Sequence, residues 1–174
     1  MNFWECALEV KEETYKLSHL APFHFDMVPE GFTRPVKVSV TFHNHCFTEG
    51  HKDQSEEAAL KPPFVNKKEG DEKSRFFSLE RYELSHELPN VIRSFEGRKV
   101  AQTRHGDFVV IATQSGQSYG VFFNLRQFNK TTCDMVVLSA YPLPPGKRPA
   151  VTKEMRFKVA VAKIMQGKAP HFPR

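Results

Sequence analysis

The most regular hydrophobic pattern in the chain is a strict alternation over residues 36–42. Four apolar side chains there are separated by Lys37, Ser39 and Thr41. A period of two with many β-branched residues is typical of a strand with one buried face. We therefore predict a strand over 36–42.

The first 30 residues have a less regular pattern, and their type of structure stays open. Residues 3–10 fit either a strand or a short helix. The aromatic run Phe23-His24-Phe25 lies between Pro22 and Pro29, and we expect it to pack as irregular structure.

A helical pattern follows later in the chain. Ser78 can cap a helix, and Leu79, Tyr82 and Leu88 form an apolar stripe. Because Pro89 disfavours helix before it and suits a first helical turn, we predict one helix over about 78–87 and another over about 89–96. Gly97 would end the second.

Four alternating segments then predict a meander of strands over 98–104, 107–114, 117–125 and 133–141. The turns His105-Gly106 and Ser115-Gly116 lie between apolar runs, as in tight hairpins. The second strand is apolar on both sides, so we expect it to be central and covered on both faces. The predicted fold class is α+β, an antiparallel four- to five-stranded meander sheet packed against helices.

After the meander, residues 142–149 predict a basic loop that leaves the sheet. The segment 153–166 has apolar side chains at helical spacing, although Phe157, Val159 and Val161 also suit a strand. We favour a helix that ends at Gly167.

Residues 49–74 are rich in Glu, Lys, Asp, Gly and Pro, which predicts a mobile charged insert. The length of 174 residues suits one hydrophobic core better than two. We therefore expect a single domain over 1–174, with the helix pair and sheet core at about 76–165.

Charge is distributed unevenly along the chain. Residues 1–89 carry 11 Lys and Arg against 16 Asp and Glu, whereas residues 90–174 carry 14 against 4. A basic half favours a polyanion such as RNA as partner, and an acidic or neutralising protein is a further candidate partner. A basic pI by itself is also common in small soluble proteins.

The three cysteines are widely spaced and include no Cys-x-x-Cys pair. They predict neither a disulfide framework nor a zinc ribbon, and they favour a reducing cytoplasm. No apolar stretch approaches the ~20 residues of a membrane span. We expect a cytoplasmic protein with no membrane association and no cofactor.

Reactive side chains are densest directly after the first predicted strand, in Phe42-His43-Asn44-His45-Cys46. The histidine pair has three interpretations: structural hydrogen bonding, catalysis or substrate binding, or half of a metal site completed by His51, Asp53 or Cys46. We favour a catalytic His45 and a substrate-binding His43 over a metal site. Whether they face the sheet residues stays open.

Further candidates are cations, histidines and hydroxyls of the basic region and the helix pair. Most helical Arg and His side chains are solvated surface residues, which is the plain alternative for His86 and Arg81. Ser139 and Tyr141 end the fourth strand of the meander, beside the basic loop. The substrate-binding candidates, besides His43, are His105, Arg126, Lys147, Arg148 and Arg156.

The sequence motifs of several enzyme classes are absent from this chain. The chain has no glycine-rich phosphate loop, no Gly-x-Ser-x-Gly elbow and no paired metal-binding carboxylates. Metal-free cleavage of RNA stays open, because the 2′-hydroxyl is the nucleophile and acid, base and cations suffice.

Over residues 76–165, two helices precede a four-stranded antiparallel meander with basic, His and Ser/Tyr side chains near strand ends. This order resembles the small ribonuclease-toxin group of barnase, EndoU, colicin ribonucleases and RelE, particularly its phage-borne members. The resemblance implies metal-independent endoribonuclease activity in a toxin or mobile-element context. It implies a pocket of Arg81, His86, Arg104, Ser139 and Tyr141. The alternative is a non-catalytic prophage accessory protein that binds nucleic acid or a protein.

Overall fold

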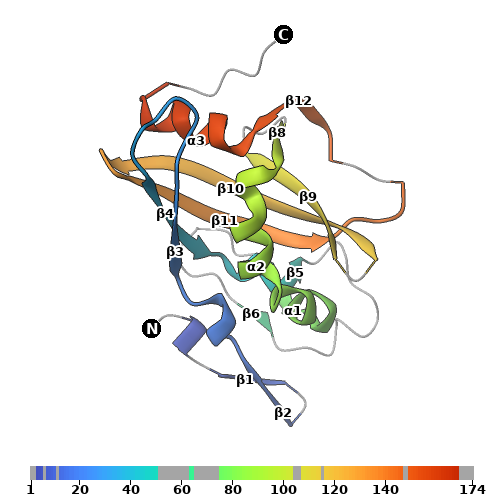
Figure 1. The fold of residues 1–174 in the computed structure, drawn as a ribbon. Coiled ribbons are helices and arrows are strands. Elements are labelled where there is room, and N and C mark those ends of the chain that lie inside the picture. Colours follow the sequence, from blue (N-terminus) through green and yellow to red (C-terminus); the bar gives the residue numbers. More distant parts are fainter. Residues whose placement is uncertain are drawn as a thin grey trace.

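The computed structural model describes residues 3–5, 7–10, 12–50, 63–64, 75–103, 107–114, 116–146 and 149–168 (Figure 1). No helix in these ranges is long and apolar enough to cross a membrane. The fold is α+β and consists mostly of strands.

The elements before the charged region are short, apart from one strand. They are the 3₁₀ helices η1 (Phe3–Glu5), η2 (Ser18–Leu20) and η3 (Asn44–Cys46), and the strands β1 (Ala7–Val10), β2 (Glu13–Lys16), β3 (Phe23–Met27), β4 (Val36–Phe42) and β5 (Thr48–Gly50). The prediction of a strand over 36–42 is confirmed, because β4 has these bounds and its apolar residues are buried in alternation.

The later elements include all three α-helices. They are β6 (Pro63–Phe64), β7 (Arg75–Phe77), α1 (Leu79–Ser85), α2 (Leu88–Arg93), η6 (Ser94–Gly97), β8 (Lys99–Thr103), β9 (Phe108–Gln114), β10 (Gln117–Asn129), β11 (Thr132–Pro142), β12 (Val151–Arg156) and α3 (Phe157–Met165). The helix pair with its break near Pro89 and the four strands of the meander are therefore present.

The main sheet is larger than the predicted meander, and it is mixed. Its seven strands have the order β12-β8-β9-β10-β11-β4-β3. Every pairing is antiparallel except β11 with β4, which is parallel. The prediction of an antiparallel four- to five-stranded sheet was wrong because β4 and β3 extend the meander at one edge and β12 extends it at the other.

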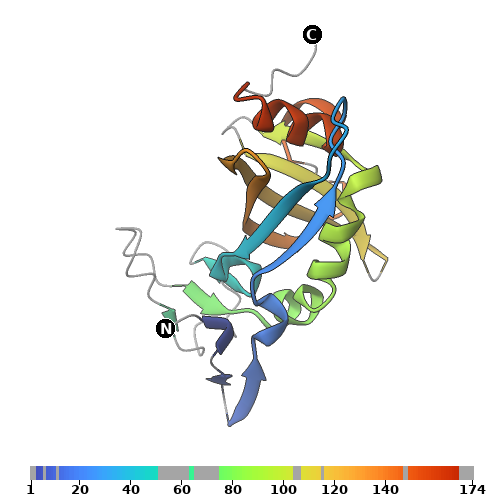
Figure 2. The ribbon, with the colours of Figure 1, turned by 60° about the vertical axis from the view of Figure 1, so that its left-hand side comes forward.

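One face of the main sheet is covered by helices. Phe95 of η6 and Phe157 of α3 pack on Phe123 of β10, with ring centroids 5.5 and 6.1 Å away respectively. Figures 1 and 2 show α2 and α3 on this same side of the sheet. This apolar layer is the core of the protein.

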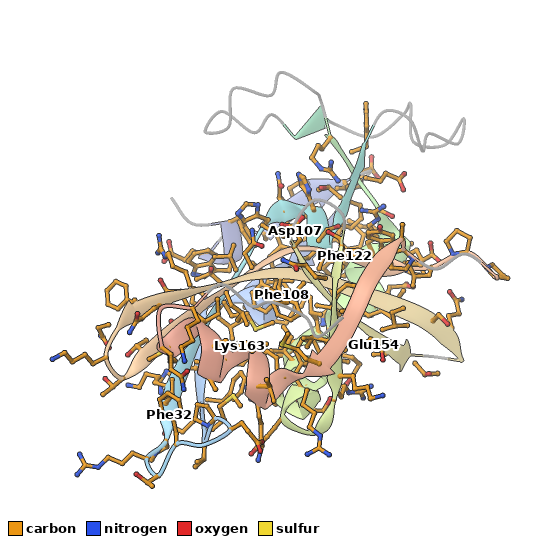
Figure 3. The ribbon with its side chains drawn as sticks, turned by 90° about the horizontal axis from the view of Figure 1, so that it is seen from above. Phe32, Asp107, Phe108, Phe122, Glu154 and Lys163 are labelled. Atoms are coloured by element: carbon orange, nitrogen blue, oxygen red, sulfur yellow. The ribbon has the colours of Figure 1, made fainter. Side chains whose placement is uncertain are left out.

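The other face, which we call the open face, has no covering helix. Register places Tyr141, Gly120 and Ile111 in one row across β11, β10 and β9. The next row is Ser139, Phe122 and Val109. Figure 3 labels one residue of each face, Phe108 on the helix side and Phe122 on the open side.

One local prediction was wrong, and two were confirmed only in part. Phe23–Phe25 is not irregular but part of β3, which pairs with β4. The helix predicted over 153–166 is present from Phe157 to Met165, but the residues before it form the strand β12, which pairs with β8. β9 is central as predicted, but its open face is only partly covered, since Val109 is 2% exposed and Ile111 38%.

A three-stranded sheet with the order β5-β7-β6 forms around the ends of the charged region. β5 pairs with β7 from Thr48 opposite Phe77 to Gly50 opposite Arg75. Most of the predicted mobile insert 49–74 lies outside the described residues. The small sheet matters for function because it anchors η3 and the start of α1 next to the end of β11.

Candidate functional site

The histidine pair lies at the end of β11 because β4 runs parallel to that strand. Phe42, the last residue of β4, is in register with Val137, and the backbone N–H of His43 donates to the Val137 carbonyl at 2.9 Å. The chain then turns into η3, which lies against the last residues of β11. His43 and His45 are both half-buried, and their ring centroids are 6.3 Å apart and nearly perpendicular.

Arg81 connects this turn to the sheet. Its Nη1 donates to the carbonyl of Thr48 at 2.8 Å and to that of His45 at 3.4 Å. Its guanidinium lies over the ring of Tyr141, 4.9 Å from the centroid. Among the described residues no carboxylate pairs with Arg81, and Nε and Nη2 have no hydrogen-bond partner. The site therefore holds a fixed positive charge with free donors.

The start of α1 explains why Arg81 is held at this place. The backbone N–H of Ser78, the N-cap residue, donates to the Phe47 carbonyl at 3.0 Å. Arg75 adds a bond from Nε to the Thr48 hydroxyl at 2.9 Å. These bonds join the small sheet, η3 and α1 into one support for the cation.

Tyr141 forms an aromatic pair with Phe122 on the open face. The two rings are stacked with centroids 5.2 Å apart and an interplanar angle of 11°. Ser139 is directly opposite Phe122 in register and is half-buried. We call His43, His45, Arg81, Ser139 and Tyr141 the terminal cluster.

Two ionisable groups beneath the terminal cluster are kept neutral. Burial raises the pKa of the Cys46 thiol to about 12, with the charge of Arg81 acting in the opposite direction. Burial likewise raises the pKa of Tyr119, whose hydroxyl has no hydrogen-bond partner among the described residues. Because a thiolate is the reactive form of cysteine, Cys46 is not equipped to act as a nucleophile.

His86, a candidate from the helix pair, lies elsewhere. It is the exposed C-cap residue of α1 and stacks on His19 with ring centroids 3.9 Å apart. His19 in turn lies 2.7 Å from the buried Ser85 hydroxyl. Five residues along a helix rotate a side chain by about 140°, so His86 and Arg81 point in different directions.

Arg126 and Arg156 also lie away from the terminal cluster. Arg126 pairs with Asp134 at 2.9 Å, and six residues of strand separate it from Gly120, or about 20 Å. Arg156 ends β12, the edge strand, and is in register with Lys99. Neither arginine reaches Tyr141.

Four predicted residues, Arg104, His105, Lys147 and Arg148, lie outside the described residues, as do His51 and Asp53. The strand ends that flank Arg104 and His105 are described. There the Thr103 N–H donates to the Asp107 carbonyl at 2.8 Å. Of the predicted pocket, Arg81, Ser139 and Tyr141 lie at the end of β11. His86 lies on the helix pair against His19, and Arg104 is outside the described residues.

Two participants in the site were missed from the sequence. Thr48 accepts bonds from both arginines through its hydroxyl and carbonyl. Phe122 was not a candidate, although it stacks on Tyr141. A register shift in β11, between the residues opposite Phe122 and Phe123, breaks the simple alternation.

No group of three or more His, Cys, Asp or Glu that could hold a metal ion occurs among the described residues. The terminal cluster combines two imidazoles, a guanidinium and two hydroxyls. These groups can donate and accept protons and stabilise negative charge.

The YjaZ family model matches residues 7–165, which covers most of the chain. The protein therefore belongs to the YjaZ family. No curated protein and no solved structure matches the sequence.

Proposed function

We propose that this member of the YjaZ family is a metal-independent endoribonuclease whose active site is the terminal cluster. The single observation that supports this most is the spacing of His43 and His45 beside Arg81. Their rings are 6.3 Å apart, and the guanidinium has no carboxylate partner among the described residues. In this proposal the phosphodiester binds beside the two imidazoles, and each imidazole reaches one of its oxygens at about 2.6–3.2 Å.

The proposed reaction is an intramolecular transesterification. One imidazole accepts the proton of the ribose 2′-hydroxyl as its oxygen bonds to phosphorus. The other imidazole donates a proton to the 5′-oxygen as the P–O5′ bond breaks. The products are a 2′,3′-cyclic phosphate and a free 5′-hydroxyl, so atoms and charges balance.

Arg81 would stabilise the negative charge that develops on the phosphoryl oxygens. Its Nε and Nη2 retain donors, while Nη1 is committed to the protein. Tyr141 fixes the guanidinium plane by the contact at 4.9 Å. A preoriented cation of this kind needs no rearrangement during the reaction.

The test is incubation of the purified protein with unstructured RNA in EDTA. We expect cleavage with cyclic-phosphate ends and no cleavage of DNA, which lacks the 2′-hydroxyl. His43→Gln and His45→Gln should each remove the activity, whereas His24→Gln should not, because His24 is exposed on the edge strand β3, which contributes no residue to the terminal cluster. Intact RNA, or cleavage that persists in both cluster variants, would overturn the proposal.

A second candidate function is non-catalytic binding of RNA by the same surface. The observation in its favour is the stacked pair of Phe122 and Tyr141, which suits base stacking. Salt-sensitive binding of RNA without any cleavage would support this function instead.

The biological setting that we propose is a toxin-like role in the cytoplasm, where RNA is the accessible polyanion. Induced expression should then arrest growth of the host cells. Expression of the His45→Gln variant at the same level should not. Equal growth arrest by both forms would separate toxicity from RNA cleavage.

A further inference from the structure

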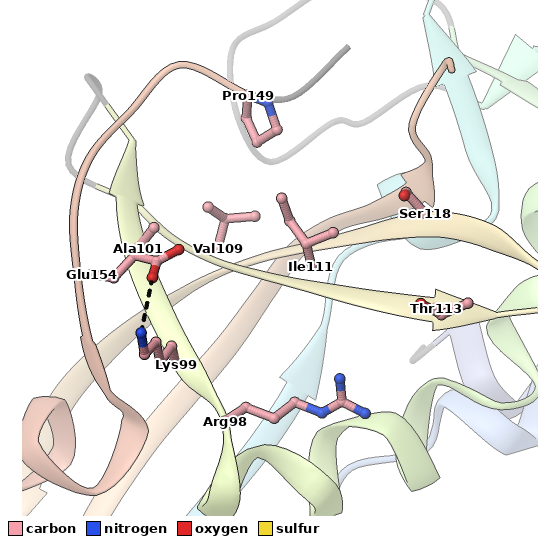
Figure 4. A pocket seen from close by; sticks show the side chains of 9 residues that line it. All are labelled: Arg98, Lys99, Ala101, Val109, Ile111, Thr113, Ser118, Pro149 and Glu154. Atoms are coloured by element: carbon pink, nitrogen blue, oxygen red, sulfur yellow. Dashed lines mark ion pairs between the residues drawn. The ribbon is translucent and has the colours of Figure 1, made fainter. Parts of the chain in front are cut away.

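A cleft of about 440 Å³ lies on the open face, on the side of Phe122 away from β11. Its floor is formed by Ala101, Val109 and Ile111 of β8 and β9. Figure 4 shows Val109 and Ile111 directed toward Pro149, which belongs to the connection from β11 to β12. The cleft is therefore an apolar slot with a floor of strands and a wall from this connection.

The rim of the cleft is polar and mainly basic. Arg98 and Lys99 lie on one side, and the hydroxyls of Thr113 and Ser118 lie on the other. Among the described lining residues the only carboxylate is Glu154, which pairs with Lys99 at 3.7 Å. Both partners are exposed, so this ion pair is weak and an anionic ligand can compete with it.

The cleft lies next to the terminal cluster on the open face. Gly120 lies between Ile111 and Tyr141 in the same row of the sheet. Two strand spacings, or about 10 Å, separate the cleft floor from Tyr141. A Cβ atom on Gly120 would lie 3.0 Å from the Phe122 ring and 3.2 Å from Leu143. The missing side chain therefore leaves room for Phe122 and Leu143 to pack over Gly120.

We propose that this cleft is a subsite for an unpaired nucleotide next to the cleaved phosphate, so that the substrate is single-stranded RNA. This inference rests on the proposed function. The aliphatic floor contacts the flat face of a base, the hydroxyls contact its edge, and Arg98 and Lys99 contact a phosphate. A duplex keeps its bases stacked inside the helix and cannot place one in such a slot.

The test uses Ile111→Glu, which places a carboxylate on the cleft floor at an exposed position. Val28→Glu is the matched control, because Val28 is 42% exposed and Ile111 38%, and Val28 does not line the cleft. The probe is a short 2′-O-methyl oligouridylate, which cannot be cleaved by transesterification. Circular dichroism and thermal unfolding verify that both variants are folded.

We expect Ile111→Glu to weaken binding of this probe about tenfold, equivalent to about 1.4 kcal/mol. Val28→Glu should bind it as the wild type does, and a duplex of the same sequence should compete poorly. Equal affinity of Ile111→Glu and wild type, or equal binding of duplex and single strand, would overturn the subsite. Because the probe is not cleaved, failure of the RNA-cleavage assay with retained, Ile111-dependent binding would contradict the catalytic proposal alone.

Discussion

The protein contains two histidine pairs, and they differ in the space between their rings. The rings of His43 and His45 are nearly perpendicular, with centroids 6.3 Å apart, and they lie beside the guanidinium of Arg81, which has no carboxylate partner in the described part of the chain. His19 and His86 lie stacked at 3.9 Å on the helix pair. The first pair lies beside a guanidinium, whereas the second pair is stacked face to face.

The two pairs also differ in their surroundings. Burial, and to a smaller extent the charge of His86, lowers the pKa of His19 to about 4. Its Nε2 is 2.7 Å from Ser85, whose hydroxyl donates to the Tyr82 carbonyl. This pair is part of the local packing, whereas His43 and His45 lie beside the cation of Arg81. That difference makes His43 and His45 the better candidates for catalysis.

The largest expected effect comes from changing the two pairs in parallel. His43→Gln and His45→Gln should each lower RNA cleavage by about 10²- to 10⁴-fold, the usual contribution of an acid or base. His86→Gln should leave the rate within about twofold of wild type. Rates on one RNA substrate in EDTA measure this, and loss of activity in His86→Gln alone would reverse our assignment of the pairs.

A second expected effect distinguishes Arg81 of the terminal cluster from Arg93, which contacts an aromatic ring on the covered face. Arg81→Lys keeps the positive charge but loses the planar guanidinium. A lysine cannot bond the two carbonyls and also present further donors to a phosphate, so we expect the rate of cleavage to fall by about 10²-fold. Arg93→Lys is the matched control, because Arg93 lies 4.2 Å over Phe23 and outside the cluster. Equal kcat/KM of Arg81→Lys and wild type would remove Arg81 from the proposed mechanism.

The sequence was informative where local pattern and fold agree. β4 follows its alternation from Val36 to Phe42, and the strands of the meander are separated by short turns as predicted. Segment 151–165 shows where the local hydrophobic pattern is insufficient. Its apolar residues fit both the strand period and the helix period, because the strand β12 ends at Arg156 and the helix α3 begins at Phe157.

The terminal cluster was only partly predictable. Its five residues were all candidates, but their convergence depends on the parallel pairing of β4 with β11, which joins residues about 95 apart in the sequence. The hydrophobic periodicity of either strand does not indicate which strand it pairs with. His86 was grouped with Arg81 because both belong to the predicted helix pair, although their side chains leave α1 in different directions.

A third expected effect concerns the hydroxyl of Tyr141. Tyr141→Phe retains the stacking on Phe122 and the cation contact but loses a donor, so we expect cleavage to fall about tenfold. Tyr82→Phe is the control from the other pair, since its hydroxyl donates to the Lys16 carbonyl at 3.2 Å. A rate for Tyr141→Phe equal to that of Tyr82→Phe would limit Tyr141 to positioning Arg81.

The smallest expected effect concerns the stacked pair of His19 and His86 and is measured as a change in the free energy of unfolding. Because the folded-state pKa of His19 is about 4 and its ordinary value is 6.5, the unfolded chain binds a proton more readily between these values. The contribution of a neutral His19 is therefore fully present above pH 6.5 and is lost as the pH falls toward 4. The side chain is half exposed, so we expect this loss to be about 1 kcal/mol rather than the larger value for full burial.

His19→Gln can keep the bond to Ser85 but does not titrate, which makes it the variant for this measurement. Urea unfolding at pH 7 and pH 4.5 should show a loss of stability in wild type that is about 1 kcal/mol larger than in His19→Gln. His24→Gln, at an exposed position on β3, should behave as wild type does. If wild type and His19→Gln lose the same stability, His19 is not held neutral by its packing. The electrostatic difference between the two histidine pairs would then be wrong, whereas the difference in ring geometry would remain.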